Sequence, residues 1–365
     1  MGGSEQKYVL DAFQSNWVAP LGPNVDLFEK QLTSYTNTAG AVSLSSGTAA
    51  LHLGLLALGV KRGGVVLCQS MTFAASAFPI QYIGAEAVFI DSETETWNMD
   101  PVLLKQAIED LLSKNQKPAA IVVVHLYGMP AKMNEILEIA AYYEIPVLED
   151  AAEALGSKYF DKPCGGLGDI GVLSFNGNKI ITTSGGGAFL SNDAKKVQLA
   201  RHWSAQSKEP APYYLHKETG YNYRMSNVCA GIGRGQIEVL DERVKKRRAI
   251  HENYRKLLSD VAQVTFLNEP EGCYSNRWLT TILFDASLGS DFPEQVRLKL
   301  EEVNIESRPL WKPLHQQPIF TANTHYNNGV SDDLFARGLC LPSGTAMADE
   351  VMVKVAGIVK SCVTS

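Results

Sequence analysis

The feature that most constrains the fold is a regular alternation of short apolar runs and longer helical stretches between residues 41 and 150. Strands are predicted at 41–44, 65–68, 87–90, 119–124 and 146–148. Helices are predicted between them, at 49–58, 73–83, 101–113 and 133–143. Strands that alternate with helices at this spacing indicate βαβ units, so we predict a mostly parallel sheet covered on both faces.

In such a sheet the ligand binds beyond the carboxyl ends of the strands. The polar residues that fall at these ends are Ser46, Thr72, His125, Tyr127 and Asp150. We therefore expect a ligand site at this edge.

The rest of the chain divides into a helical start and a less regular second half. Helices are predicted at 6–13 and 26–35, then a strand at 188–191, a helix at 193–202, a loop at 209–223 and one long helix from 227 to about 259. A strand at 280–284, a helix at 293–303, a loop at 307–315 and a last helix from residue 349 follow. We predict a large domain over 1–240 and a small C-terminal domain over 241–365.

Composition narrows the function classes. The chain has 365 residues, of which 45% are hydrophobic and 20% charged, and a net charge of −6, which argues against a nucleic-acid binder. The six cysteines are scattered without a C-x-x-C pair, so we expect free thiols in a reducing cytoplasm and no metal site. We see no apolar run long enough to cross a membrane and no signal peptide, and we expect a cytoplasmic protein without a membrane partner.

The turn at 45–48, between the first predicted strand and its helix, is rich in small and hydroxyl residues. Backbone N–H groups at a helix N-terminus are free to bind an anion, so Gly47 and Thr48 form a candidate phosphate cradle. The alternative is a simple helix cap in which Ser46 or Thr48 satisfies the first turn.

The segment 170–187, IGVLSFNGNKIITTSGGG, contains a candidate nucleophile. A strand-like run at 171–175 leads into the turn 176–179, and a second β-branched run at 180–183 leads away, so Lys179 is predicted at the tip of a hairpin-like turn. Held near the protein interior, such an amine loses its proton more readily. The alternative is an ordinary surface lysine.

Asp150 ends an apolar strand in PVLEDAAEALG, 29 residues before Lys179. Together with the cradle, these residues are three parts of a pyridoxal phosphate (PLP) site: a lysine for the Schiff base, an aspartate that keeps the pyridine nitrogen protonated, and amides for the phosphate. The G-x-G-x-x-G match at 166–171 precedes a strand-like run rather than a helix, which argues against a dinucleotide site. A hydrolase triad of Ser45, His125 and Asp150 lacks the G-x-S-x-G elbow.

Several motifs resemble one family. SSGTAALHLGL (45–55), HLYG (125–128), EDAAEALG (149–156), SFNGNK (174–179) and GYNYRMSN (220–227) resemble the DegT-type nucleotide-sugar aminotransferases, which belong to the aspartate-aminotransferase (fold type I) superfamily. NKIITTSGGG, SNRWLT (275–280), SRPLWKPLH (307–315) and CLPSGTAM (340–347) look most like the enzymes of the bacillosamine pathway that aminate UDP-2-acetamido-4-keto-6-deoxyglucose. Relatives usually carry a short segment before the residue that corresponds to Met1, so we expect a trimmed or different start.

The resemblance implies an α/β fold of the aspartate-aminotransferase type, with a mostly parallel central sheet in the large domain and a smaller C-terminal α+β domain. It implies that Lys179 is the Schiff-base lysine, that Asp150 holds the pyridine nitrogen and that Glu153 lies near the ring hydroxyl. Phe73 would stack on the ring, although it could equally be an ordinary core aromatic. The phosphate would be held by Gly47, Thr48, Ser174 and, from the partner subunit of a homodimer with shared active sites, Asn222.

For the sugar nucleotide, charge and placement in the loop suggest Arg308, Trp311, Lys312 and His315, with a structural role for Trp311 as an alternative. Related dehydratases carry histidine at the lysine position, so Lys179 argues against that activity.

The expected reaction moves an amino group from glutamate to C4 of a UDP-linked 4-keto-6-deoxy-N-acetylhexosamine, for bacillosamine-type sugars in protein glycans or surface polysaccharide. Three alternatives remain open from the residues: a GDP- or dTDP-linked keto sugar (perosamine-type), a Schiff-base aldolase without PLP, and a non-enzymatic PLP-binding regulator.

Overall fold

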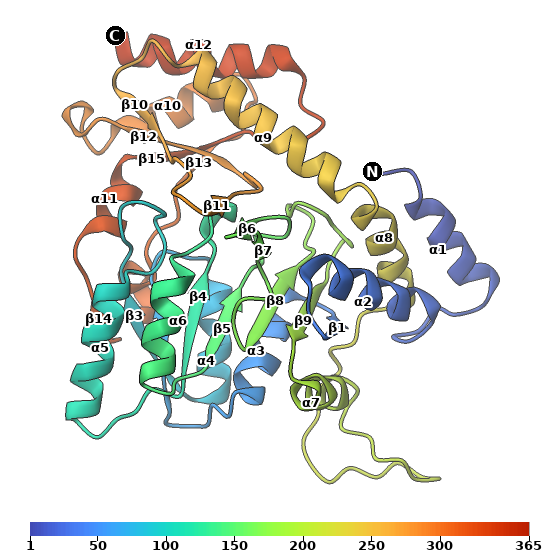
Figure 1. The fold of residues 1–365 in the computed structure, drawn as a ribbon. Coiled ribbons are helices and arrows are strands. Elements are labelled where there is room, and N and C mark those ends of the chain that lie inside the picture. Colours follow the sequence, from blue (N-terminus) through green and yellow to red (C-terminus); the bar gives the residue numbers. More distant parts are fainter. Residues whose placement is uncertain (365) are drawn as a thin grey trace.

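The computed structural model describes residues 1–364. Within them, one sheet forms the middle layer of the larger part of the molecule (Figure 1). In spatial order its strands are β1 (Gly40–Leu44), β9 (Gly187–Ser191), β8 (Ile170–Ser174), β5 (Val147–Asp150), β4 (Ala120–Val124), β2 (Val65–Gln69), β3 (Glu86–Ile90) and β14 (His325–Tyr326). All run in the same direction except β9, which is antiparallel to both neighbours. The prediction of a mostly parallel sheet is confirmed.

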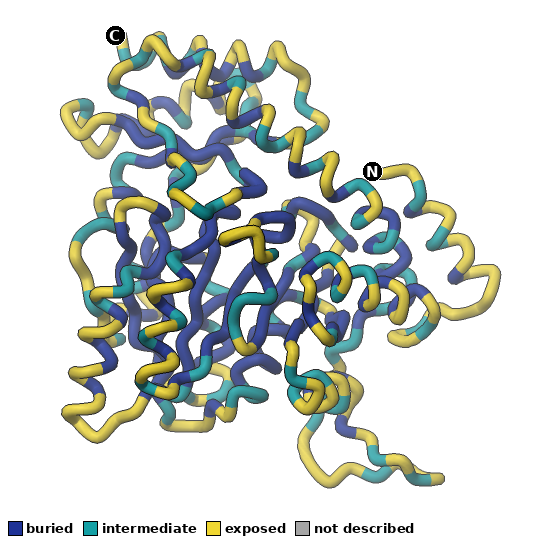
Figure 2. The backbone as a smooth tube through the Cα atoms, viewed as in Figure 1, coloured by how far each residue is buried: buried dark blue, intermediate teal, exposed yellow. Residues whose placement is uncertain are grey.

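Helices cover both faces of this sheet because successive strand residues point to opposite sides. Val66 and Cys68 pack toward α3 (Gly47–Ala57), α4 (Phe78–Ile83) and α7 (Ala194–Ser204). Leu67 packs toward α5 (Pro101–Ser113) and α6 (Met133–Tyr142). Toward β1 and β9 the sheet is covered by α2 (Pro23–Thr36) and α8 (Asn227–Ile237), and α1 (Glu5–Gln14) lies along α8. Figure 2 shows the resulting buried centre under half-exposed helices.

A second, antiparallel sheet lies above the first in Figure 1 and is built from later residues. Its strands, in order, are β10 (Val264–Phe266), β12 (Thr280–Phe284), β15 (Gly338–Leu341) and β13 (Arg308–Pro309). The helices around it are α9 (Leu240–Leu257), α10 (Phe292–Glu301), α11 (Val330–Arg337) and α12 (Asp349–Thr364). A separate apolar cluster, which includes Tyr254, Phe284 and Val355, fills this unit.

Two late strands return to the first unit. β14 pairs with β3 at the edge of the large sheet, and β11 (Cys273–Tyr274) pairs with β6 (Lys158–Tyr159), which also pairs with β7 (Lys162–Pro163). The domain boundary at residue 240 stays a prediction. The remaining elements are short 3₁₀ turns: η1 (Ala74–Ser76), η2 (Leu126–Gly128), η3 (Ala286–Leu288), η4 (Leu314–Gln316) and η5 (Pro318–Phe320).

Three predicted elements differ from the structure. The run 180–183 is not a strand, because the edge of β8 is already paired with β9, where Ser174 lies opposite Gly187. The long helix from 227 is two helices, broken at Val239, because α8 packs on α2 while α9 crosses to the second sheet. The helix predicted at 73–83 is a 3₁₀ turn followed by α4, and Phe73 itself is extended.

None of the helices among the described residues combines the length and the hydropathy that a membrane-spanning helix requires.

Candidate active site

A cavity of about 1230 Å³ opens at the carboxyl ends of the parallel strands, between the large sheet and the second unit. Residues from both units line it. Among the residues predicted from the sequence, those in its wall are Ser46, Gly47, Thr48, Thr72, Phe73, Asp150, Glu153, Ser174, Lys179, Arg308 and Trp311.

The turn between β1 and α3 has the geometry of an anion cradle. Ser46 is the N-cap of α3, and its Oγ accepts a hydrogen bond from Ala49 N at 3.0 Å, so the simple cap is present as well. The first-turn N–H groups of Gly47 and Thr48 have no partner within the helix. A Cβ on Gly187 would lie 2.4 Å from Gly47 N, and a Cβ on Gly47 would lie 3.0 Å from Ser174 Cβ. The backbones of three segments therefore meet here only because two of the residues are glycines, which leaves a cradle suited to a phosphate.

Asp150 lies at the end of β5 and is 4% exposed. Its carboxylate accepts hydrogen bonds from Ser76 Oγ at 2.7 Å and from Ala152 N at 3.2 Å. Burial raises the pKa of Asp150, while these two hydrogen bonds and the charge of Lys179 oppose the rise. A buried carboxylate in a cavity wall is suited to a cationic partner such as a protonated pyridine nitrogen.

Lys179 follows β8 in a turn, where its N–H donates to Asn176 O at 3.0 Å, so the predicted turn is present. It is not the tip of a hairpin, because the run 180–183 is not a strand and β8 pairs with β9. Its Nζ lies 3.3 Å from Glu153 Oε1. Glu153 is 3% exposed, and its other oxygen accepts a hydrogen bond from Tyr127 N at 2.7 Å. Burial raises the pKa of Glu153 to about 7, and the positive charge of Lys179 opposes the rise. The amine and the carboxylate are thus held together beside Asp150.

Phe73 is 60% exposed and lines the cavity, so it is not an ordinary core aromatic. Its ring centroid lies 5.6 Å from that of Trp311, which in turn contacts Tyr127 at 5.5 Å. Trp311 N also donates to Tyr127 Oη at 2.9 Å. Trp311 is therefore both a cavity residue and part of the packing.

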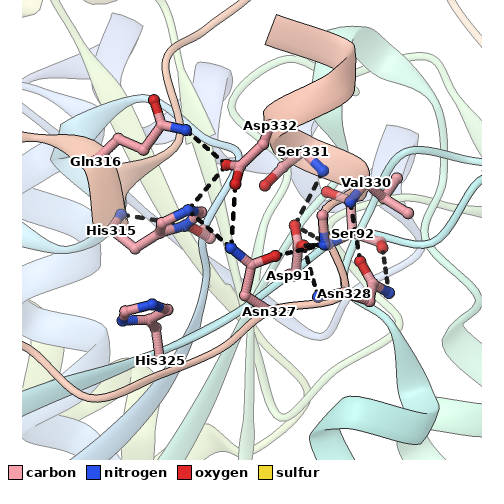
Figure 3. Close-up of polar contacts among 12 residues, drawn as sticks. Asp91, Ser92, His315, Gln316, His325, Asn327, Asn328, Val330, Ser331 and Asp332 are labelled. Atoms are coloured by element: carbon pink, nitrogen blue, oxygen red, sulfur yellow. Dashed lines mark hydrogen bonds and ion pairs between the residues drawn. The ribbon is translucent and has the colours of Figure 1, made fainter.

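Lys312 and His315 are not in the cavity wall, although the sequence predicted them beside the substrate. His315 instead lies in a partly exposed polar network. Its Nδ1 contacts Ser70 Oγ at 2.7 Å, and its Nε2 contacts Asp332 Oδ1 at 2.9 Å (Figure 3). Lys312 Nζ lies 5.9 Å from the ring centroid of Phe335. Lys312 and His315 point away from the cavity because the backbone of this loop is irregular, so neighbouring side chains do not share one direction.

Asn222 is exposed and also lies outside the cavity wall. Its predicted phosphate contact from a partner subunit stays a prediction.

His125 and Tyr127 do not line the cavity either, although both follow β4. His125 Nε2 pairs with Glu149 Oε1 at 2.8 Å, and its Nδ1 accepts a hydrogen bond from Ala131 N at 3.0 Å. Both ring nitrogens are therefore occupied, so a triad of Ser45, His125 and Asp150 is excluded. Glu149 further accepts hydrogen bonds from Leu167 N and Gly168 N, so the glycine run 166–171 wraps this carboxylate. Cys164 lies beside His125 and Glu149, so the three could together hold a metal ion, but backbone N–H groups already bind the carboxylate of Glu149.

The sequence prediction missed several residues of the wall. Trp278 and Arg247 reach the cavity from the second unit, and Ser76 donates a hydrogen bond to Asp150. Thr72, which the sequence did place at a strand end, contacts Ser76 Oγ at 2.8 Å. SNRWLT was singled out only as a family motif, and no local pattern in it indicated a contact with Lys179.

Comparison with known proteins agrees with this geometry. The sequence profile of the DegT/DnrJ/EryC1/StrS aminotransferase family matches residues 1–360. The chain is 49% identical over 359 residues to Bacillus subtilis (strain 168) EpsN, a provisionally assigned pyridoxal phosphate-dependent aminotransferase, and the match covers 97% of this chain and 92% of EpsN.

Two further relatives bear on the substrate. The GDP-perosamine synthase of Escherichia coli O157:H7 is 36% identical over 353 residues, covering 97% of this chain and 94% of that enzyme. The UDP-4-amino-4,6-dideoxy-N-acetyl-beta-L-altrosamine transaminase of Campylobacter jejuni is 38% identical over 239 residues, covering 64% of this chain and 62% of that enzyme. The family resemblance is confirmed, whereas these matches do not separate the UDP-sugar subgroup from the perosamine type.

A solved structure has the same fold. The DegT DnrJ EryC1 StrS aminotransferase from Brucella abortus superposes with a TM-score of 0.91 at 28% identity, covering 98% of this chain and 95% of that one. The cradle, the buried Asp150 and the amine of Lys179 fit the cofactor of this family. The chain belongs to the DegT/DnrJ/EryC1/StrS family and is a pyridoxal phosphate-dependent sugar aminotransferase.

Proposed function

We propose that the protein transfers the amino group of glutamate to C4 of a UDP-linked 4-keto-6-deoxy-N-acetylhexosamine in the cytoplasm, for a bacillosamine-type sugar in protein glycans or surface polysaccharide. Overall, glutamate becomes 2-oxoglutarate, and C4 of the sugar exchanges its ketone oxygen for the amine and one hydrogen. The observation that carries this proposal is the convergence of Lys179, Glu153 and Asp150 with the glycine cradle on one cavity.

When bound, PLP carries the amino group between the two substrates and withdraws electrons from the reacting carbon. In this site Asp150 would hold the ring nitrogen, and Ser174 with the first turn of α3 would hold the phosphate. The face of Phe73 would cover the ring, and Glu153 would hold the ring hydroxyl. Lys179 Nζ lies in the same wall, where it would move the proton on the reacting carbon as acid and base.

The nucleotide would occupy the part of the cavity lined by the second unit. Arg308 and Trp311 lie there, one suited to a diphosphate and the other to a ring system. Binding energy from these remote contacts would orient the ketone against the site of transfer. The Campylobacter relative, whose name specifies a UDP-linked N-acetylated sugar, supports the UDP assignment.

The second candidate is a GDP-linked 4-keto-6-deoxy sugar, and it is supported by the similarity to GDP-perosamine synthase. Holoenzyme supplied with ¹⁵N-glutamate and a panel of UDP-, GDP- and dTDP-linked 4-keto sugars separates the two. We expect ¹⁵N at C4 of the UDP-linked N-acetylhexosamine, with kcat/KM at least tenfold above the others. Preferential labelling of the GDP sugar would replace the first candidate by the second.

The proposed homodimer can be tested with two inactive variants. Lys179→Ala and Asn222→Ala are purified separately, unfolded and refolded together. If Asn222 acts across the interface, mixed dimers contain one site with both native residues, and activity returns. If Asn222 acts within its own chain, no mixture restores activity and the shared site is wrong.

A further inference from the structure

The loop 275–278 brings a tryptophan from the second unit onto the lysine of the first. Trp278 is 2% exposed, and its ring centroid lies 4.2 Å from Lys179 Nζ. Its Nε1–H donates to the carbonyl oxygen of Asn178 at 2.8 Å. One side chain therefore contacts both the amine of Lys179 and the backbone directly before it.

The same loop also holds the backbone of Glu153, the residue whose carboxylate contacts this amine. Asn276 is completely buried, and its Nδ2 donates to the carbonyl oxygens of Glu153 at 2.8 Å and Leu155 at 2.9 Å. Its Oδ1 accepts the N–H of Trp278 at 2.8 Å. A single amide thus links the backbone of Glu153 to the backbone of Trp278.

Two arginines of α9 brace the loop from the other side. Arg247 Nη1 donates to Trp278 O at 2.9 Å, and Arg248 Nη1 donates to Ser275 O at 2.6 Å. Arg277 adopts a left-handed backbone, with φ of 53°, while its guanidinium donates to Leu267 O at 2.8 Å. A non-glycine residue keeps such a conformation only where its surroundings enforce it. The loop is therefore held in one conformation.

These contacts have a consequence for the amine. A lysine has a long flexible side chain, and a free ammonium group can occupy many positions. An ammonium group above an indole face is attracted by the ring electrons, and Glu153 attracts it from a second direction. Together the ring and the carboxylate define one resting position for Nζ.

We propose that Trp278 is a positioning residue that holds the amine of Lys179 in place whenever this amine is not bonded to the cofactor. The proposal rests on the proposed role of Lys179 as acid and base in the transfer. Because α9 and the second sheet carry the loop, the position of the amine depends on the docking of the second unit against the first.

The test measures Lys179 directly in the cofactor-free protein. Acetylation by N-hydroxysuccinimide acetate is followed at the peptide that contains Lys179 by mass spectrometry. Trp278→Leu removes the aromatic ring and the N–H, whereas Trp278→Phe keeps a smaller aromatic face and loses the N–H donor. Trp97→Leu is the matched control. Trp97 is 4% exposed in the same apolar cluster, but it contacts neither the amine of Lys179 nor the carbonyl oxygen of Asn178.

We expect Trp278→Leu to accelerate acetylation of Lys179 about tenfold, with Trp278→Phe close to wild type and Trp97→Leu unchanged. In the holoenzyme, Trp278→Leu should lower kcat while KM for the sugar nucleotide stays within about twofold. Equal acceleration in Trp97→Leu and Trp278→Leu, or a wild-type rate in Trp278→Leu, would overturn the proposal. If the acetylation result holds but Lys179→Ala keeps full turnover, the role of Lys179 fails and the positioning contact stands.

Discussion

The carboxylate of Glu153 lies 3.3 Å from the amine nitrogen of Lys179, and both side chains line one cavity, Glu153 buried and Lys179 partly exposed. Their elements are unrelated locally: Glu153 follows β5, and Lys179 follows β8. The parallel pairing of β5 with β8 brings the two ends together. The site is thus a product of the sheet order.

Stability of the cofactor-free protein should depend on pH through Glu153. Burial raises the pKa of Glu153 from an ordinary 4.5 to about 7, so between these values the folded state binds a proton that the unfolded state releases. Stability should therefore fall as pH rises from 4.5 to 7, and Glu153→Gln should remove that fall. Urea unfolding of both proteins across this range measures it. If the free energy of unfolding of the two proteins changed with pH in parallel, the pKa of Glu153 would not be raised in the folded state.

The glycine cradle predicts a contrast between two alanine substitutions in one glycine run. A Cβ on Gly187 would lie 2.4 Å from Gly47 N, whereas the nearest atom to a Cβ on Gly185 lies 3.9 Å away. Gly187→Ala should cost about 1–3 kcal/mol of stability and weaken PLP binding, because the N-terminus of α3 must shift. Gly185→Ala should leave both nearly unchanged. Thermal unfolding and PLP titration compare the two variants. Equal effects on stability and PLP binding would contradict the close approach of Gly187 to the backbone of Gly47.

His315 and Arg308 should separate stability from substrate binding. His315→Ala leaves Ser70 and Asp332 without their imidazole partner, so it should cost about 1–3 kcal/mol with little change in KM for the sugar nucleotide. Arg308 lines the cavity and its side chain is 77% exposed, so Arg308→Met should raise KM while stability stays nearly constant. Steady-state kinetics gives KM for the sugar nucleotide, and thermal unfolding gives the stability, of each of the two variants. The reverse pattern would restore the sequence prediction for His315.

A buried imidazole in the second unit predicts sensitivity to acid. Both ring nitrogens of His251 are buried without a hydrogen-bond partner among the described residues. Burial, together with Arg277, Arg255 and Arg248, lowers the pKa of His251 from 6.5 to about 3.

Between these pH values the unfolded chain binds the proton and the folded chain does not, so stability falls as pH drops below 6.5. His251→Leu should relieve this loss, by about 2 kcal/mol at pH 5. The stability of wild type and His251→Leu is measured from unfolding curves at pH 5 and pH 8. If the stability difference between the two proteins were the same at both pH values, the imidazole would not be buried in its neutral form.

Local signals in the sequence predicted much of the fold and part of the site. The cap at Ser46, the strand that ends at Asp150 and the turn before Lys179 depend on a few neighbouring residues, and each is where it was predicted. The run 180–183 has equally strong β character but is not a strand, because no sheet edge was free for it. Propensity predicts a strand only where a partner exists.

Long-range contacts could not be predicted in this way. Trp278 reaches Asn178 across 100 residues, and Asn276 reaches Glu153 across 123. Nothing in SNRW specifies which buried carbonyl or amine it will contact. The loop 307–315 was correctly placed near the cavity, but without a helical or strand period its sequence could not indicate that Arg308 faces the cavity while His315 faces Ser70.

The most direct measurement of the central claim locates the bond between protein and cofactor. Holoenzyme is reduced with borohydride and digested, and the peptide that carries the pyridoxyl group is identified by mass spectrometry. The group should be found on Lys179, and prior incubation with glutamate should prevent its attachment. Attachment to another lysine, or no attachment before glutamate is added, would contradict the claim that Lys179 is the cofactor lysine of this aminotransferase.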